Sequence, residues 1–506
     1  MKNLNSLAWS AVLAAVLCAT TARADVTADQ IWKDWSDYYA SLGQTITAGK
    51  TDRQGDTLVL GDVKLVSQFP DGSSEATIPE LRLKEVGDGT VEVTFSEDVP
   101  LVLHTKSPDG KANDIKMTLH QSGMTVKAGG TPESLDYDYA APEISLNIDD
   151  MTVDGSAAPV KMKLTAKAGS GKYHSENANG RTITSEMNAD ALDVAFSGAD
   201  PQGSGTFNIT GTMNGLSGTG TATLPQNVDM KDINGAMQAG MIIDGAFNYA
   251  DGAYKIEANG ADGAFTADTS TTAGTLNVKM SKDGISYGGA SGETKMALSG
   301  AGMPFPVDAT IAESAFNFAM PVSKSDAAGP AALLIKLVDL KVSDALWNMV
   351  DPGSKLPRDP ATLVLDVTGA VKPLIDLFDP KQSEALVSAA ENPEAAMGAS
   401  PFEVSEAKIN ALQVKAVGAE LTGTGDVTFD NSAGMPKPTG AVDLKLTGAN
   451  KLMDSLVAMG LVPEDQMMGM RMMLGMFAVP AGDDAVISKI EFKEDGGIYA
   501  NGQKLQ

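Results

Sequence analysis

The feature that most constrains this chain is the strict alternation of apolar and polar residues along short segments. In residues 420–429, one side of an extended chain would carry leucine, glycine, valine and phenylalanine, and the other side only glutamate, threonine and aspartate. Residues 442–447 alternate valine and leucine with aspartate, lysine and threonine in the same way. A period of two is typical of a β-sheet with one buried and one solvated face.

Similar segments recur from residue 57 to residue 318, with Asp-Gly pairs between them that predict tight hairpin turns. Closely spaced strands without intervening helices indicate an antiparallel meander. Phe247–Tyr249 and Tyr254–Ile256 flank Asp251-Gly252 and predict one such hairpin. The glycine-rich stretch 198–302 keeps the alternation, so we expect thin, glycine-bent strands there.

Three segments change to helical spacing, at residues 27–43, 371–391 and 450–478. Thr27 and Gln30 form a capping box, and Ile31 and Trp35 begin an apolar stripe. Because this first helix lacks the basic face of a membrane-surface helix, we expect it to plug the open end of the sheet. The third segment breaks at 460–463 and therefore predicts a helical hairpin.

Together these patterns predict a mainly β fold. We expect a large, curved, mostly antiparallel sheet, arranged as a meander, a trough or a sandwich, with a few capping helices. Residues 25–325 would hold the first helix and the β-meander. Residues 326–506 would hold strands and helices, including the hairpin, with the sheet continuous across a join near residues 322–329.

The N-terminus is typical of an export signal. Lys2 precedes an apolar run, Leu7–Leu17, and Ala22-Arg23-Ala24 predicts cleavage after Ala24 and a periplasmic protein. Cleavage would remove Cys18, the one cysteine, and with it any disulfide or thiolate metal site. No later segment holds about 18 consecutive apolar residues, so we expect no transmembrane anchor after cleavage.

The chain is strongly acidic, with 38 Lys and Arg residues against 65 Asp and Glu residues and a net charge of −27. Loss of two basic residues with the signal would bring the charge to −29 (−27 − 2). Such a charge excludes a general nucleic-acid binder and disfavours contact with anionic lipid head groups.

No catalytic motif, phosphate-binding loop or metal-binding helix occurs in the sequence. If Thr105 lies opposite Ile115, His104 and His120 are about 13 Å apart, too far to share one metal ion. Acidic pairs such as Asp149-Asp150 lack calcium-loop spacing and are typical of charged turns. We therefore expect no catalytic residue, no metal and no cofactor.

Methionine is the more informative residue, because eight of the 25 methionines lie between Met453 and Met476. A helix that is apolar over most of its circumference is either buried on several sides or forms an adaptable apolar contact surface. The residues we expect to bind an apolar ligand against the sheet are Leu452, Leu456, Met459, Met467, Met470, Leu474 and Phe477.

Several segments resemble an alphaproteobacterial exported family catalogued as domain of unknown function 2125. They are residues 342–360, 459–461, 472–477 and 497–503, and the resemblance extends over nearly all of the mature chain. It implies neither an activity nor site residues. More loosely, residues 421–446 with the helix that follows are similar to AsmA-like envelope proteins, which implies a β-sheet trough that carries lipid. This chain differs in lacking a retained membrane anchor.

Apolar side chains at every second position must be sheltered from water, because their exposure would be costly. We expect a non-enzymatic periplasmic envelope protein that binds or shields an apolar ligand, of the lipid class, in a sheet groove covered by helices. The alternative is an envelope scaffold, with or without a protein partner, whose apolar face is only core. An acidic hydrolase is the third hypothesis.

Overall fold

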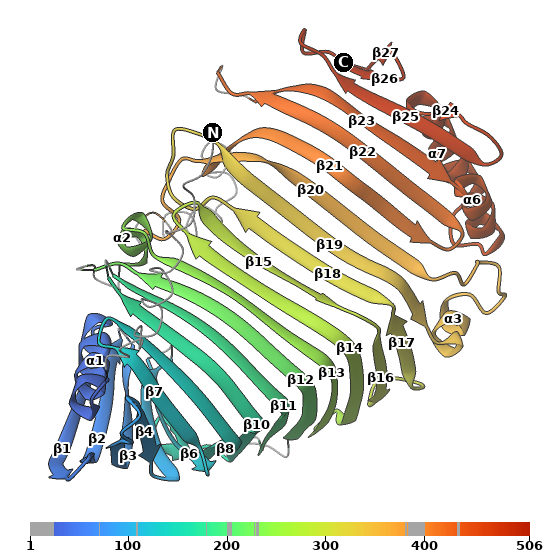
Figure 1. Ribbon diagram of the computed structural model, residues 1–506. Helices are drawn as coiled ribbons and strands as arrows, with labels where there is room; N and C mark the ends of the chain where they lie inside the picture. The colour runs from blue at the N-terminus through green and yellow to red at the C-terminus, as the bar shows by residue number, and fades with distance from the viewer. Residues whose placement is uncertain are drawn as a thin grey trace, which may run out of the picture.

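The computed structural model describes residues 25–69, 71–107, 110–178, 180–199, 205–226, 228, 232–379, 382, 400–432 and 436–505. These residues form one antiparallel sheet of 27 strands together with five helices (Figure 1). The predicted mainly β fold, with a large antiparallel sheet and a few helices, is confirmed. The predicted export signal, residues 1–24, lies outside the described residues.

The first strands are β1 (Thr45–Gln54), β2 (Thr57–Phe69), β3 (Gly72–Glu85), β4 (Val91–Phe95), β5 (Asp98–Lys106), β6 (Ala112–Ser122), β7 (Thr125–Thr131), β8 (Ser134–Val153), β9 (Ser156–Ala157), β10 (Val160–Asn177), β11 (Arg181–Ala199), β12 (Thr206–Leu224) and β13 (Ile242–Gly260). The later strands are β14 (Gly263–Ser281), β15 (Gly284–Ser291), β16 (Thr294–Gly300), β17 (Val307–Ile311), β18 (Glu313–Met320), β19 (Gly329–Val342), β20 (Ala361–Pro373), β21 (Phe402–Ala416), β22 (Ala419–Asp430), β23 (Lys437–Thr447), β24 (Val479–Pro480), β25 (Ala485–Phe492), β26 (Ile498–Ala500) and β27 (Gln503–Lys504). The helices are α1 (Ala28–Ser41), α2 (Ile233–Gln238), α3 (Asp344–Val350), α6 (Ala449–Ala458) and α7 (Glu464–Phe477).

Strands that follow each other along the chain are mostly neighbours in the sheet, but twice a long strand faces two short ones. β3 pairs with β5 along one half and with β4 along the other, and β8 then pairs with both β6 and β7. In the same way β14 pairs with β15 and β16, and β19 pairs with β18 and β17. The sheet therefore remains one continuous layer through both divisions.

The apolar residues stay on one face although they change between even and odd positions within a strand. In β2, Leu58 and Leu60 belong to the same buried cluster as Val63, although Val63 is at an odd position. The residue that shifts the alternation is Asp62, whose φ is 51°. Ala168 in β10 and Asp339 in β19 have φ values of 50° and 54°. One left-handed residue shifts the alternation of a strand by one position, as in a β-bulge.

The hairpin predicted at Asp251-Gly252 is wrong, because β13 runs through both residues without a break. Asp251 pairs with Asn214 of β12 on one side and Thr272 of β14 on the other, and the Asn214 amide donates a hydrogen bond of 2.7 Å to its carboxylate. Long partner strands on both sides outweigh the local preference for a turn. Asn501 and Gly502, in contrast, do form a turn, with φ values of 51° and 81°.

Helix α1 covers the apolar face of the first strands, as the plug hypothesis predicts. The Thr27 side chain accepts a hydrogen bond from the backbone N–H of Gln30, whose side chain accepts one from Thr27, so the capping box is confirmed. Ile31 is fully buried in a cluster with residues of β2, β3, β4, β7 and β8. Trp35 Nε1 donates a hydrogen bond of 3.0 Å to the hydroxyl of Tyr137.

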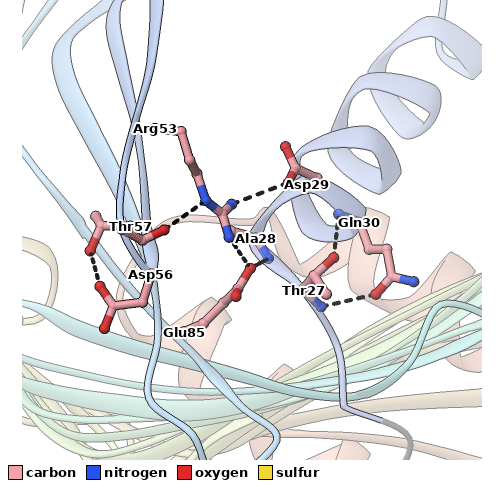
Figure 2. A network of polar contacts seen from close by, with 9 residues as sticks. Thr27, Ala28, Asp29, Gln30, Arg53, Asp56, Thr57 and Glu85 are labelled. Carbon is pink, nitrogen blue, oxygen red and sulfur yellow. Dashed lines mark hydrogen bonds and ion pairs between the residues drawn. The ribbon is translucent and has the colours of Figure 1, made fainter.

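A polar network joins the start of α1 to the sheet (Figure 2). The guanidinium of Arg53 contacts Asp29 at 3.1 Å and Glu85 at 2.8 Å. The backbone N–H of Ala28, which has no partner within the helix, donates a hydrogen bond of 3.0 Å to Glu85. This bond holds the pKa of the Glu85 carboxyl below its usual value, and the contact with Arg53 adds to the effect.

The Glu85→Gln variant should lower the free energy of unfolding by about 1–2 kcal/mol at pH 7, because two hydrogen bonds lose a charged acceptor. Since the folded-state pKa of Glu85 is lowered, this stabilisation is complete above the unfolded-state pKa and disappears as the pH falls through the folded-state value. Urea titrations monitored by tryptophan fluorescence at pH 7 and about pH 3 measure the difference. The exposed Glu80→Gln variant is the control, and equal effects of both variants would contradict the assignment.

The middle of α1 is held by a buried ion pair. Arg181, the first residue of β11, contacts the carboxylate of Asp34 through both terminal nitrogens, and the two side chains are only 9% and 10% exposed. The guanidinium also lies 4.8 Å from the ring centroid of Tyr38. Removal of one partner would leave a buried charge without its counter-ion.

The Asp34→Ala variant should therefore lose about 3–5 kcal/mol of unfolding free energy. Asp37→Ala is the matched control on the same helix, because its ion pair with Lys33 is exposed and contributes about 0.5 kcal/mol at most. Chemical denaturation of both variants provides the comparison. A loss below about 1 kcal/mol for Asp34→Ala would show that the pair does not anchor α1.

The remaining helix predictions differ in outcome. Residues 450–478 form the expected hairpin as α6 and α7. The helix predicted over 371–391 is wrong at its start, because Val371–Pro373 complete β20 and pair with β21. Residues 374–379 are not helical either, and Leu377 and Phe378 pack with α2 instead. The other residues of the prediction, apart from Gln382, lie outside the described part of the chain.

Candidate functional site

The register of the strand pairs aligns two rows of side chains across the centre of the sheet. The first row consists of the directly paired residues Val278, Tyr287, Phe318, Leu333, Val367 and Ile409. The second consists of Leu276, Gly289, Phe316, Ile335, Leu365 and Leu412. Because paired residues project from the same side of a sheet, each row lies on one face.

This is the face that α1 and α2 cover elsewhere. Pairing continues from Val278 through Gly245, Gly220 and Ser185 to Tyr173, which packs against the cluster under α1. Met280, two residues from Val278, packs against the cluster that includes α2. The two rows therefore begin on β14, beside the region that α2 covers, and run away from α1 as far as β21.

Several apolar side chains in and beside these rows are exposed. Tyr287 exposes 46% of its area, and Phe316 and Phe318 expose 41% each, whereas Leu60 under α1 is fully buried. We call the exposed set the apolar strip; its members are Val278, Tyr287, Phe316, Phe318, Leu333, Ile335, Leu363 and Val414. Together they expose about 600 Å² of apolar surface, the upper end of the range for one patch on a soluble monomer.

The dimensions of the apolar strip suit a long hydrocarbon. It crosses six strands, β14, β15, β18, β19, β20 and β21, which at about 4.8 Å per strand corresponds to roughly 24 Å. One leaflet of a bilayer core, the depth that a single acyl chain occupies, is about 15 Å. Among the described residues, the strip is an open surface of a single layer and not the interior of a sandwich.

Glycines next to aromatic residues keep the surface shallow. A Cβ atom added to Gly289 would lie 2.9 Å from Cε1 of its cross-strand partner Phe316, so the ring lies over the glycine. The same arrangement joins Gly198 with Phe207 and Gly171 with Tyr139. Aromatic rings laid over cross-strand glycines shield the backbone and fix the register. This packing explains why the glycine-rich middle of the sequence forms thin but ordered strands.

The seven predicted site residues all belong to or adjoin the hairpin, and the structure does not place them equally. Met467 is 2% exposed, and Leu452, Leu456, Met459 and Leu474 are half-buried. Met470 and Phe477 are exposed, at 54% and 39%. Helix α6 contacts α7 and β22, so part of the set forms the interior of the hairpin.

The interpretation of α7 as a helix buried on several sides is therefore wrong. Its mid-helix charge, Arg471, makes an ion pair with Asp454 of α6. The N-terminus of α6 is held by Asp484, which accepts backbone hydrogen bonds from Asn450 and Lys451. Burial raises the pKa of Asp484, but these hydrogen bonds outweigh it, so the pKa is lowered overall.

The apolar strip is the site that the sequence reasoning missed. Its residues occur in segments recognised as alternating strands, and a strand pattern does not tell a covered side chain from an uncovered one. The available signal was the concentration of aromatic residues at Tyr287, Phe316 and Phe318, within a chain whose aromatic content is only 5%.

The three histidines of the described chain share one environment. His104, His120 and His174 each face an aspartate directly across the strand pair, namely Asp114, Asp98 and Asp136, with contacts of 2.5–2.7 Å. The register assumed from the sequence was two residues out, because Thr105 lies opposite Asn113 rather than Ile115. No group of three or more His, Cys, Asp or Glu residues in the described chain could hold a metal ion.

The opposite face carries charged side chains. A cleft of about 940 Å³ is lined by charged residues of this face, among them Lys127, Asp136 and Lys172, and also by Tyr137 and Tyr173 of the apolar face. The acidic pair Asp149-Asp150 also has hydrogen-bond partners, because Thr118 donates a hydrogen bond to Asp149 and Lys116 donates one to Asp150. These charged groups make cross-strand polar contacts and contribute nothing to the apolar strip.

The hairpin offers a direct comparison of buried and exposed methionines. Met467→Ala should cost about 2–5 kcal/mol of unfolding free energy, because it leaves a cavity between the helices. The neighbouring Met468→Ala should change stability by about 0.5 kcal/mol or less, because Met468 is 68% exposed. Thermal and chemical denaturation measure both effects. Equal losses would show that α7 is covered on its outer side.

Comparison with known families gives one match. A model of the family described as "Uncharacterized protein conserved in bacteria (DUF2125)" matches residues 251–502. The predicted resemblance is confirmed, but the match covers the C-terminal half and not nearly all of the mature chain. The matched segment contains the whole apolar strip and the hairpin. No curated protein matches the chain at a significant level.

Proposed function

Since the chain belongs to this uncharacterized bacterial family, DUF2125, we propose from its geometry that it is a non-enzymatic, exported protein that binds the acyl chains of a lipid on the apolar strip. The observation that carries the proposal is the apolar strip, whose exposed apolar side chains lie on one face of six neighbouring strands. Export rests on the pattern of residues 1–24. The resemblance to AsmA-like proteins agrees with a lipid ligand but remains a prediction.

The energetics favour an acyl chain over a compact ligand. An acyl chain of 16 carbons with half of its methylenes covered would gain roughly 6 kcal/mol from the hydrophobic effect. A shallow surface cannot surround a compact molecule, whereas a linear chain can contact successive strands along the rows. A bound acyl chain would also remove the free-energy cost of exposing the apolar strip to water.

The polar side chains support a binding function without catalysis. The histidines and the acidic pair 149–150, which are the obvious candidates for acid–base chemistry, make cross-strand hydrogen bonds or ion pairs on the opposite face. A hydrolase would need such groups next to the bound substrate. In this proposal the strip supplies only apolar contacts.

The test is a direct search for a ligand. Protein purified from an expressing bacterium should release acyl species in native mass spectrometry and should bind a fluorescent fatty acid. The double variant Phe316→Ser with Ile335→Ser removes two exposed side chains of the strip and should weaken fatty-acid binding at least tenfold, since roughly 1–2 kcal/mol is lost at each position.

The matched control is Leu334→Ser, which lies between Leu333 and Ile335 on β19 and projects from the opposite face. It should leave binding unchanged. Protein that carries no acyl species and takes up no fatty acid would end the lipid proposal and favour a scaffold. Equal losses in the control would show that unfolding, not the strip, causes the effect.

A further inference from the structure

The outer side of α7 exposes more large apolar side chains than any role inside the hairpin requires. Met472 is 69% exposed, and Met468, Met473 and Met476 are between 57% and 68% exposed. Leu461, in the turn before α7, is 58% exposed. Figure 1 shows the hairpin at the end of the last strands, beside the sheet. The exposed methionines therefore form a separate surface from the apolar strip.

The exposed side chains surround much of the helix. At about 100° per residue, the positions of Met468, Met472, Met476, Met473 and Met470 cover roughly 200° of the circumference of α7. The buried Met467 and the half-buried Leu474 occupy the opposite side, next to α6. A flat protein partner would contact one side of such an arc, whereas a fluid apolar medium can surround all of it.

The charges of the hairpin and of the whole chain indicate which kind of lipid surface it could contact. Residues 466–482 contain one charged residue, Arg471, which is paired with Asp454. The hairpin therefore lacks the basic face that draws amphipathic helices to anionic lipids, and the net charge of −27 opposes such a surface. These properties fit a bilayer of neutral, zwitterionic lipids.

The length of α7 determines how it could meet a bilayer. Its 14 residues extend for about 21 Å, less than the roughly 30 Å of the hydrocarbon core. In agreement, no described helix is long and apolar enough to cross a membrane. A short apolar helix of this kind lies in the interface with its side chains about 5–10 Å deep.

We propose that the α6–α7 hairpin is a membrane-contact element that inserts the exposed methionines of α7 into the surface of a neutral bilayer. Methionine suits this role because its flexible thioether adapts to disordered acyl chains. The inference rests on the proposed function, because a lipid that binds the apolar strip has to leave a bilayer first. The hairpin would hold the protein at that surface while the strip accepts the chain.

The test uses the purified protein and vesicles of phosphatidylcholine in a flotation assay. The wild-type protein should float with the vesicles, and addition of anionic phosphatidylglycerol should reduce binding. The triple variant Met468→Gln, Met472→Gln and Met476→Gln should bind at least tenfold more weakly. Met349→Gln is the matched control, because Met349 is 59% exposed on another helix, and it should bind as the wild-type protein does.

Fatty-acid binding by the triple variant separates this proposal from the proposed function. Unchanged fatty-acid uptake together with lost flotation would support a membrane-contact hairpin. A wild-type protein that does not bind neutral vesicles would overturn the inference, even if it takes up the fatty acid. If light scattering shows an oligomer that the triple variant abolishes, the surface joins two copies of the chain, and the inference is also overturned.

Discussion

The whole structure depends on the continuous ladder of antiparallel backbone hydrogen bonds. Each inner strand has a partner on both sides, so the backbone polar groups are satisfied without a second layer. At one edge β1 carries Lys50, Asp52 and Arg53, and at the other edge β24, β26 and β27 are only two or three residues long. Charged or very short edge strands discourage further strand addition.

The ladder also determines which side chains lie together. Because the register is maintained across the divided strands, apolar residues far apart in sequence form common rows, and charged residues pair on the opposite face. Helices then divide the apolar face into different environments. Under α1 its residues form a buried core, whereas the apolar strip on β14, β15 and β18 to β21 remains in contact with water.

Sequence patterns predicted the structure correctly where contacts between residues close in sequence determine it. The Thr27 and Gln30 capping box begins a helix because its hydrogen bonds join residues three apart. The hairpin predicted at Asp251-Gly252 does not form, because the neighbouring strands β12 and β14 pair with these residues and hold them in an extended conformation. The pairing register predicted around His104 and His120 was wrong for a related reason. A shift of two residues leaves every side chain on the same face, so the alternating sequence pattern cannot distinguish the two registers.

The sequence by itself determined that this chain forms an antiparallel sheet with one apolar face, because period two is a local property of the extended backbone. It also located the methionine-rich hairpin and the family. Only the tertiary structure decided which parts of the apolar face are covered. Phe316 and Leu60 both occupy apolar positions in alternating strands, yet one is exposed and the other buried. The difference depends on whether a helix packs above the strand, which is a long-range contact that no local pattern encodes.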